Sequence, residues 1–427
     1  MSFLDINQSL VMSGIFDLIP DHVQTQVQDL APYLAGISLV LTGLFMNPLN
    51  VPLPLFFQVH DRKKLRNRSK AYDPPSSLKS KKFLVLVNPN AGAGMGKLTY
   101  DEVIKPMLEK AKQSHDVVFT TGPGHASQVC REVAANPALE SYDCIISASG
   151  DGMLHECLNG LLSNVSASSK GHNTRTAKRQ LPPLAVVPVG SGNGVADSLY
   201  GRRCGPHVAL EKIIAGKPSD IDVMAMTYVG KPELGLIYDL HFFCWAVFSD
   251  HDFLTENTLR WLGPMLKMVL APAIVILRMT WYGGVLDFAP VEVAKDLKKH
   301  YKDPKSWPES PDDKTMRRVD DSFWCMAAGN LKEAGGDLSA TPYVKQDEGA
   351  VDILMVTKSR GWVSRFRGLM VFLQAENGEH TEFDDIQIVK CNKFRLKPGK
   401  SRYRGSPGHL QLSGQEQENG EVEVEVS

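Results

Sequence analysis

Glycine-rich turns follow three apolar stretches of this chain, and this repeated arrangement constrains the fold more than any other feature. The stretches cover residues 83–87, 144–148 and 184–189, and they lead into Asn-Pro-Asn-Ala-Gly-Ala-Gly-Met-Gly, Ser-Gly-Asp-Gly and Gly-Ser-Gly-Asn-Gly. Runs this apolar are typical of strands buried on both faces. Because glycine has no Cβ, such turns let backbone N–H groups approach a polyanion, and a helix that begins just after adds its positive dipole end. A single turn of this kind is commonly structural, but three favour a nucleotide-binding enzyme.

Strand-like and helix-like segments alternate up to about Gly216. Strands are expected at 83–87, 115–120, 143–148 and 184–189, and helices at 100–113, 126–134 and 152–162. This alternation predicts a parallel sheet in a Rossmann-like α/β nucleotide-binding domain. Beyond Gly216, short strand-like runs separated by turns predict an antiparallel β-sandwich, with strands near 221–226, 236–240, 323–327, 350–356 and 387–390. We therefore predict an apolar and basic extension over 1–80, the α/β domain over 81–216 and the β-sandwich domain over 217–427, which ends in an acidic tail.

Composition sets the broad class of the protein. With 427 residues, 43% hydrophobic and 22% charged, the chain has an ordinary soluble composition and room for two cores. The net charge of −1 points to no class of partner, and no nucleic acid is expected. The seven cysteines are scattered without Cys-x-x-Cys spacing, which argues against a disulfide framework and against a zinc site. A reducing cytoplasmic compartment fits best.

The N-terminal extension has an apolar and a basic part. Residues 33–57 are largely apolar, but prolines interrupt them and the uncharged run from Tyr33 to Met46 is shorter than the roughly 20 residues that span a bilayer. A basic stretch follows between Arg62 and Lys82. Together the two parts predict either peripheral association with anionic lipid or a packed helical appendage with a solvated linker.

Taken in order, the three glycine motifs resemble those of the diacylglycerol-kinase-like superfamily of lipid kinases and, within it, the sphingosine kinases. His155-Glu156 behind the second motif extends the resemblance, as does Asp250-His251-Asp252 followed by Arg-x-Leu-Gly at 260–263. The resemblance covers about residues 82–412. It implies a lipid-binding second domain, ATP and Mg²⁺ as cofactors, and transfer of the γ-phosphate to the primary hydroxyl of a sphingoid base. Ceramide or diacylglycerol kinase activity, or a lipid-binding pseudokinase scaffold, are the alternatives.

The resemblance also assigns residues to the reaction. Asp151 matches the general base, and a carboxylate that accepts the hydroxyl proton accelerates such a step by about 10²–10⁴. Arg260 is expected to face the triphosphate, because a guanidinium neutralises charge on the transferring group. Either Thr120 or Thr121 matches the family's threonine. The other expected nucleotide contacts are Asn88, Pro89, Asn90, Ser149, Gly150, Glu156, Gly190, Ser191 and Gly192.

Substrate class depends on the acidic pair of the Asp-x-Asp segment. A sphingoid base carries an ammonium near the reacting hydroxyl, whereas ceramide and diacylglycerol do not, so a carboxylate at the pocket mouth discriminates between them. Asp252 matches the family's amine-binding aspartate best, and Asp250 and Gly152 are further candidate substrate contacts. The apolar segment 254–277 is expected to be helical, with interruptions at Pro264 and Pro272. It is expected to form either core helices or part of the lipid pocket that the family has there.

One departure from the family pattern concerns the end of the chain. The family has Asp-Gly-Glu in a turn that reaches the nucleotide's phosphates or metal, whereas the matching turn here reads Ser413-Gly414-Gln415. Asn419-Gly420-Glu421 is an alternative counterpart. No metal ligand can be assigned from the sequence, and weaker handling of metal or ATP is expected.

Overall fold

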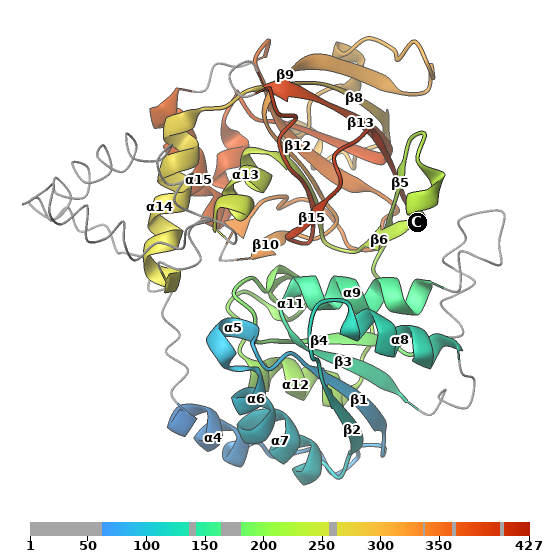
Figure 1. The fold of residues 1–427 in the computed structure, drawn as a ribbon, viewed down its shortest axis with the longest axis vertical. Coiled ribbons are helices and arrows are strands. Elements are labelled where there is room, and N and C mark those ends of the chain that lie inside the picture. The colour runs from blue at the N-terminus through green and yellow to red at the C-terminus, as the bar shows by residue number, and fades with distance from the viewer. Residues whose placement is uncertain are drawn as a thin grey trace, which may run out of the picture.

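In the residues that it describes, the computed structural model has two large sheets, one above the other in Figure 1. It describes residues 62–135, 142–163, 181–255, 263–335, 338–360, 364–401 and 405–427, and gives the backbone alone at 62–65, 93, 263–269 and 373. The earlier of the two sheets in the chain is parallel and the later one is antiparallel. The predicted fold class, a Rossmann-like α/β domain followed by an antiparallel β domain, is confirmed.

The parallel sheet has the strand order β2-β1-β3-β4. Its strands and the helices around them are β1 (Lys82–Val87), α5 (Ala91–Gly94), α6 (Gly96–Thr99), η1 (Tyr100–Ile104), α7 (Lys105–Lys110), β2 (Ser114–Phe119), α8 (His125–Ala135), β3 (Cys144–Ser149), α9 (Asp151–Leu162), β4 (Leu184–Pro188), α11 (Gly194–Tyr200) and α12 (Pro206–Ala215). Alternate residues of β1 point to opposite faces of the sheet. Val85 packs with η1, α7 and α12, whereas Leu84 and Leu86 pack with α8 and α9. Helices therefore cover both faces, as the apolar strands predict.

The antiparallel sheet has ten strands, and β8 pairs with both β9 and β13. Since β12 also lies between β9 and β13, these four strands form a closed ring of ladders. Its strands are β5 (Met224–Tyr228), β6 (Ile237–Asp239), β7 (Phe242–Ala246), β8 (Tyr282–Pro290), β9 (Arg317–Gly329), β12 (Val351–Thr357), β13 (Gln387–Ser401), β14 (Leu410–Leu412), β15 (Gln415–Gln417) and β16 (Val422–Val426), and β10 (Glu333–Gly335) with β11 (Leu338–Ser339) forms a separate hairpin. Trp245 and Phe323 are among the largest side chains that are fully buried in its core.

Three helices lie together beside the antiparallel sheet (Figure 1): α13 (Val247–Phe253), α14 (Gly263–Arg278) and α15 (Arg365–Gln374). Pro272 lies inside α14, so the interruption of the helix expected at this proline is wrong. The sequence around Pro272 is strongly apolar, and Ala271 and Ile274 are buried in a cluster shared with α13 and α15. This burial compensates for the one backbone hydrogen bond that a proline removes.

The basic stretch after residue 61 is helical over α4 (Arg62–Ala71) rather than a linker. The Ser69 hydroxyl donates a hydrogen bond to the carbonyl of Glu102, and Tyr72 is buried in the core of the α/β unit. The apolar segment 33–57 lies outside the described residues. In the ranges that the structure covers, no helix is long and apolar enough to cross a membrane.

Candidate active site

The loops that follow the four parallel strands carry the predicted nucleotide contacts. Since the strands are parallel, their carboxyl ends meet at one edge of the sheet, and the strand order changes direction between β1 and β3. Ligands of open α/β sheets bind at such a switch point. The loops after β1 and β3 meet there, and Asn88 Nδ2 lies 3.5 Å from Ser149 Oγ.

Two of the glycine turns pack directly against each other. A Cβ on Gly190 would lie 2.5 Å from the Cα of Gly150, so both residues are required by backbone packing. In the segments that follow β1 and β2, three glycines face open space, since a Cβ on Gly94, Gly122 or Gly124 would meet nothing within 4 Å. Some of the glycines that suggested phosphate binding are therefore required for packing instead. The glycines that face open space are those where a phosphate could approach the backbone.

Asp151 is the first residue of α9, and its carboxylate is held at both oxygens. Oδ2 accepts a hydrogen bond from the backbone N–H of Gly194 at 2.8 Å, and Oδ1 accepts one from Val195 at 3.1 Å. These amides begin α11, where donors otherwise lack a helical partner. The side chain is 8% exposed. Asp151 thus has a structural role at the start of α11, which we did not expect from the sequence, and its orientation is fixed.

The turn at 413–415 contacts the first turn of α9. Ser413 and Gly414 form the two-residue loop of the β14–β15 hairpin, and their φ angles of 48° and 74° suit a type I′ turn. Gln415 Nε2 donates a hydrogen bond to the carbonyl of Gly152 at 2.9 Å. The alternative counterpart of the family's turn, residues 419–421, lies at another place in the antiparallel sheet. Glu421 precedes β16 and pairs with Lys397 at 3.6 Å.

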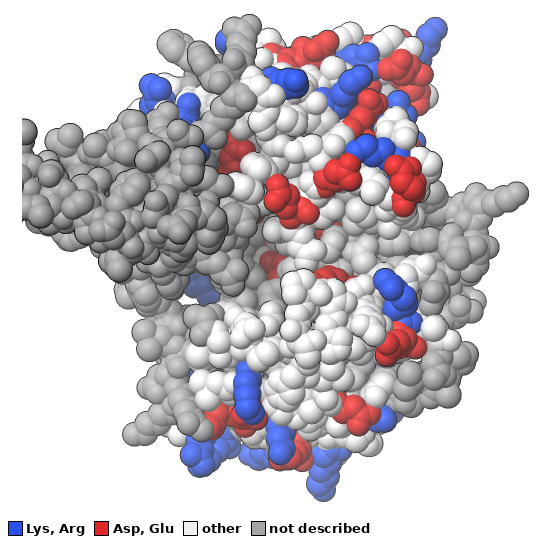
Figure 2. All heavy atoms as spheres, in the orientation of Figure 1, with Lys and Arg blue, Asp and Glu red and all other residues white. Residues whose placement is uncertain are grey.

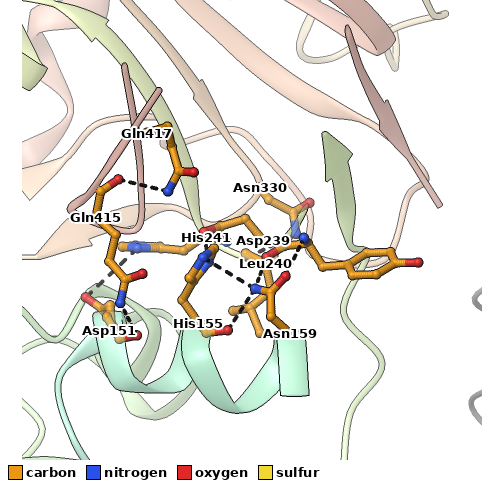
Figure 3. A network of polar contacts seen from close by, with 11 residues as sticks. Asp151, His155, Asn159, Asp239, Leu240, His241, Asn330, Gln415 and Gln417 are labelled. Carbon is orange, nitrogen blue, oxygen red and sulfur yellow. Dashed lines mark hydrogen bonds and ion pairs between the residues drawn. The ribbon is translucent and has the colours of Figure 1, made fainter. Parts of the chain in front are cut away.

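A buried polar network joins α9 to the antiparallel sheet (Figure 3). His155 Nδ1 lies 2.9 Å from Asp239 Oδ2. His241 Nε2 donates to the carbonyl of Glu333 at 2.8 Å, and its Nδ1 lies 3.9 Å from Asp151 Oδ2. Asp239 and His241 were missed in the sequence, where the only signal was two titratable residues inside the apolar run 236–246.

Asn159 completes this junction. Its side-chain amide donates to the carbonyl of Tyr238 and accepts from the N–H of the same residue, both at 2.8 Å. The amide therefore pairs with β6 as the backbone of a neighbouring strand would. This pairing gives a physical reason for an asparagine one turn after His155 on α9.

Hydrogen bonds hold the loop that follows β2 in place. Glu156 Oε2 accepts from the N–H of Gly124 at 3.0 Å, so this carboxylate organises the loop backbone. Thr120 Oγ1 donates to the carbonyl of Val87 at 3.4 Å, whereas the N–H of Thr121 donates to His125 Nδ1 at 3.1 Å. In the loop after β4, the side-chain amide of Asn193 accepts a hydrogen bond from the N–H of Gly190 and donates one to the carbonyl of the same residue. Pro89, Asn90, Ser191 and Gly192 belong to the same edge of the sheet.

The acidic pair of the Asp-x-Asp segment lies on α13. Ala246, with φ of 66°, turns the chain from β7 into this helix. Asp250 Oδ2 accepts a hydrogen bond from the hydroxyl of Tyr282 at 2.6 Å. The side chain of Asp252 is 44% exposed, and Oδ1 lies 3.1 Å from His251 Nδ1. Arg260 lies outside the described residues.

Apolar side chains surround the helix that carries Asp252. Leu254 is buried in a cluster with residues of α14, α15 and the sheet, and Phe248 packs against that cluster. Figure 2 shows a hollow between the two halves of the molecule, with acidic side chains in and above it. An exposed carboxylate beside an apolar cluster is suited to a ligand that has a cationic head and a hydrocarbon chain.

The structure of the described residues contains no group of three or more His, Cys, Asp or Glu that could hold a metal ion. The family that the sequence resembles has an acidic residue at the position of Gln415. Here the side-chain amide of Gln415 donates a hydrogen bond instead. The side chains present therefore do not form a metal site of their own, and we assign no residue to Mg²⁺.

The chain is similar to known proteins over the parallel sheet and over much of the antiparallel sheet. The diacylglycerol kinase catalytic domain matches residues 82–226. Sphingoid long chain base kinase 4 of Schizosaccharomyces pombe is 27% identical over 76% of this chain and 70% of its own length. Human sphingosine kinase 1 is 26% identical over 74% of this chain and 82% of its own, and mouse ceramide kinase is 23% identical over 74% and 62%.

Solved structures show the same layout of two sheets. A diacylglycerol kinase from Bacillus anthracis superposes with a TM-score of 0.51 at 18% identity, over 82% of this chain and 94% of the other. This likeness extends beyond the catalytic domain match into the antiparallel sheet. Together, the matched catalytic domain and the related sphingoid-base kinases support a sphingosine kinase-like, ATP-dependent lipid kinase.

Proposed function

We propose that this protein transfers the γ-phosphoryl group of ATP to the primary hydroxyl of sphingosine or a related sphingoid base. The observation that carries this choice of substrate is Asp252, a half-exposed carboxylate beside the apolar cluster of α13, α14 and α15. A sphingoid ammonium can pair with it, and the hydrocarbon chain can lie along the cluster. Ceramide and diacylglycerol have no cation to offer, so the carboxylate would remain unpaired with them.

In this proposal Asp151 accepts the proton of the lipid hydroxyl. The lipid oxygen forms a bond to the γ-phosphorus while the bond from phosphorus to the β,γ-bridging oxygen breaks, and ADP leaves. Hydrogen bonds from Gly194 and Val195 fix the carboxylate in one orientation, which reduces the motion needed to reach the hydroxyl. The open glycine positions of the first and second loops would receive the phosphates.

Mg²⁺ would enter with the phosphates of ATP, as this ion commonly does in phosphoryl-transfer sites, and would reduce the negative charge there. We propose further that the protein works in the cytoplasm and reaches its lipid at a membrane surface. The domain limits expected from the sequence remain a proposal. They agree with the positions of the two sheets, whose strands run from Lys82 to Pro188 and from Met224 to Val426.

The test is a radiolabelled ATP assay with sphingosine, dihydrosphingosine, ceramide and diacylglycerol offered separately in detergent micelles. We expect both sphingoid bases to be phosphorylated and the two neutral lipids to remain at background. Preference for ceramide or diacylglycerol would replace the proposal with one of those kinases. Binding of sphingosine without transfer to any lipid would favour the pseudokinase scaffold.

A further inference from the structure

The outward face of α15 exposes two large apolar side chains. Phe366 is 73% exposed and Leu369 is 43% exposed, and residues three positions apart lie on one face of a helix. Phe366 is the most exposed of the large hydrophobic side chains in the described ranges. Burying such a side chain contributes about 1.5–3 kcal/mol, so this face favours a partner that removes it from water.

Basic residues flank this apolar face in the sequence. The segment from Lys358 to Ala375 contains no acidic residue, and it includes Lys358, Arg360, Arg365 and Arg367. Arg367 pairs with Asp385 at 3.0 Å. Lys358, Arg360 and Arg365 are exposed. An apolar patch with a cationic rim matches an anionic lipid surface, in which acyl chains lie beneath negative headgroups.

The opposite face of α15 belongs to the candidate lipid site. Val371 is buried in the apolar cluster that also contains Val247 of α13 and Ile274 of α14. The rings of Phe372 and His251 lie 6.2 Å apart, and His251 contacts Asp252. One helix therefore separates the surroundings of Asp252 from the exposed patch.

The same helix is tied to its neighbour at the end nearest the patch. Arg365 Nε donates a hydrogen bond to the carbonyl of Leu277, in the last turn of α14, at 2.9 Å. Because α14 and α15 are joined there, contact at the patch would position both helices of the lipid site against the same surface.

We propose that Phe366 and Leu369, with the cations of 358–367, dock the protein on an anionic bilayer at the entrance of the lipid site. This inference rests on the proposed function in one respect, namely that the lipid substrate is dissolved in a membrane. Its residues do not belong to the N-terminal extension of the sequence. The anchoring contribution is expected to combine burial of the two side chains with roughly 1 kcal/mol for each cation near the headgroups.

The experiment compares the full-length protein with the double variant Phe366→Ser/Leu369→Ser. Sedimentation with vesicles of phosphatidylcholine and phosphatidylserine is measured without ATP or sphingosine, so the result does not depend on which lipid is phosphorylated. The matched control is Val229→Ser/Leu234→Ser, which removes two other exposed hydrophobic side chains from the far end of the antiparallel sheet. We expect the vesicle partition constant to fall by about tenfold or more in the α15 variant and to be unchanged in the control.

Two further readouts complete the test. Turnover on substrate in detergent micelles should be unchanged in the α15 variant, which shows that it is folded, and Lys358→Gln should weaken binding to anionic vesicles but not to pure phosphatidylcholine. Unchanged vesicle binding in the α15 variant would overturn the proposal. A wild-type dimer that this variant makes monomeric would also overturn it, because the patch would then be a contact between copies.

Discussion

Gln415 and Gly152 are 263 positions apart in the chain, yet the side-chain amide of one donates a 2.9 Å hydrogen bond to the carbonyl of the other. The contact holds the β14–β15 hairpin against the first turn of α9, next to Asp151. The antiparallel sheet thereby contributes directly to the edge of the parallel sheet where ATP is expected. A glutamate at this position would bring negative charge to the phosphate site.

The first prediction concerns the acidic version of this turn. Ser413→Asp with Gln415→Glu should lower the KM for ATP·Mg²⁺ by about tenfold, because the two added carboxylates can bind the Mg²⁺ that accompanies the phosphates and a charge-assisted contact contributes about 1.5–3 kcal/mol. The pair should also lower the free energy of unfolding by about 1–3 kcal/mol, because the carbonyl of Gly152 loses its donor. Steady-state kinetics and thermal unfolding measure the two effects.

The control for this pair is Glu421→Gln. Glu421 pairs with Lys397 beside β16, away from α9, so its neutral form should leave the KM for ATP unchanged. If Glu421→Gln weakened ATP use while the acidic pair did nothing, the assignment of 413–415 to the phosphate site would be wrong.

Asp151→Asn should reduce turnover by about 10²-fold or more, because the amide cannot accept the hydroxyl proton. The structure adds a second consequence. An asparagine can accept a hydrogen bond from only one of Gly194 and Val195, so about 1–3 kcal/mol of stability should be lost as well. Rapid-quench turnover and chemical unfolding should both be measured.

Asp239→Asn separates these two effects. Asp239 holds His155 in the same buried network but lies outside the reaction, so its variant should lose stability and keep turnover within about tenfold of wild type when folded. Turnover lost equally in both variants would mean that disruption of the network, rather than removal of a base, explains the Asp151 result.

The acidic pair on α13 yields a third prediction. Asp252→Asn should raise the KM for sphingosine by an amount equivalent to about 1.5–3 kcal/mol, because the ammonium loses a charged hydrogen-bond partner. The KM for ATP should stay the same. Asp250 already accepts a hydrogen bond from Tyr282, so Asp250→Asn should affect sphingosine far less. Equal effects of the two variants would contradict the assignment of Asp252.

A fourth prediction concerns pH and stability. Burial lowers the pKa of His380 from 6.5 to about 4, and its Nε2 donates to the carbonyl of Ala340. The unfolded chain therefore binds a proton between pH 6.5 and 4 that the folded chain excludes, so this residue destabilises the fold as pH falls through that window. His380→Gln keeps a donor for Ala340 and should remove up to about 3 kcal/mol of the acid-induced loss. Urea unfolding of wild type and His380→Gln at pH 7.5 and pH 4.5 measures how much unfolding free energy each protein loses on acidification. An equal loss in the two proteins would exclude His380 as the cause of the acid-induced destabilisation.

The regular parts of the fold could be predicted from the sequence because hydrophobic patterns report burial. The strand expected at 83–87 is Lys82–Val87, and the helix expected at 152–162 is Asp151–Leu162. β8 was missed, since its Gly283-Gly284 pair reads as a turn although the backbone continues as a strand there. The expected break at Pro272 failed because burial of the surrounding helix outweighed the proline.

The candidate site could be predicted only where its residues are close in sequence. The loops around Asn88, Ser149 and Gly190 were expected because each follows an apolar strand. The pairing of His155 with Asp239 joins residues 84 positions apart, and no local pattern encodes it. The role of Asp151 at α11 was missed for the same reason, since its donors in that helix lie 43 and 44 positions away in the sequence.

The role of Asp252 in substrate choice is tested by the initial rate of ³²P transfer from ATP to sphingosine and to ceramide, each at equal mole fraction in the same micelles, by wild type and Asp252→Asn. We expect rapid transfer to sphingosine by the wild type, little transfer to ceramide, and a variant whose preference for sphingosine has largely disappeared. Transfer to ceramide that matches or exceeds transfer to sphingosine in the wild type, or a preference that Asp252→Asn leaves intact, would contradict this role.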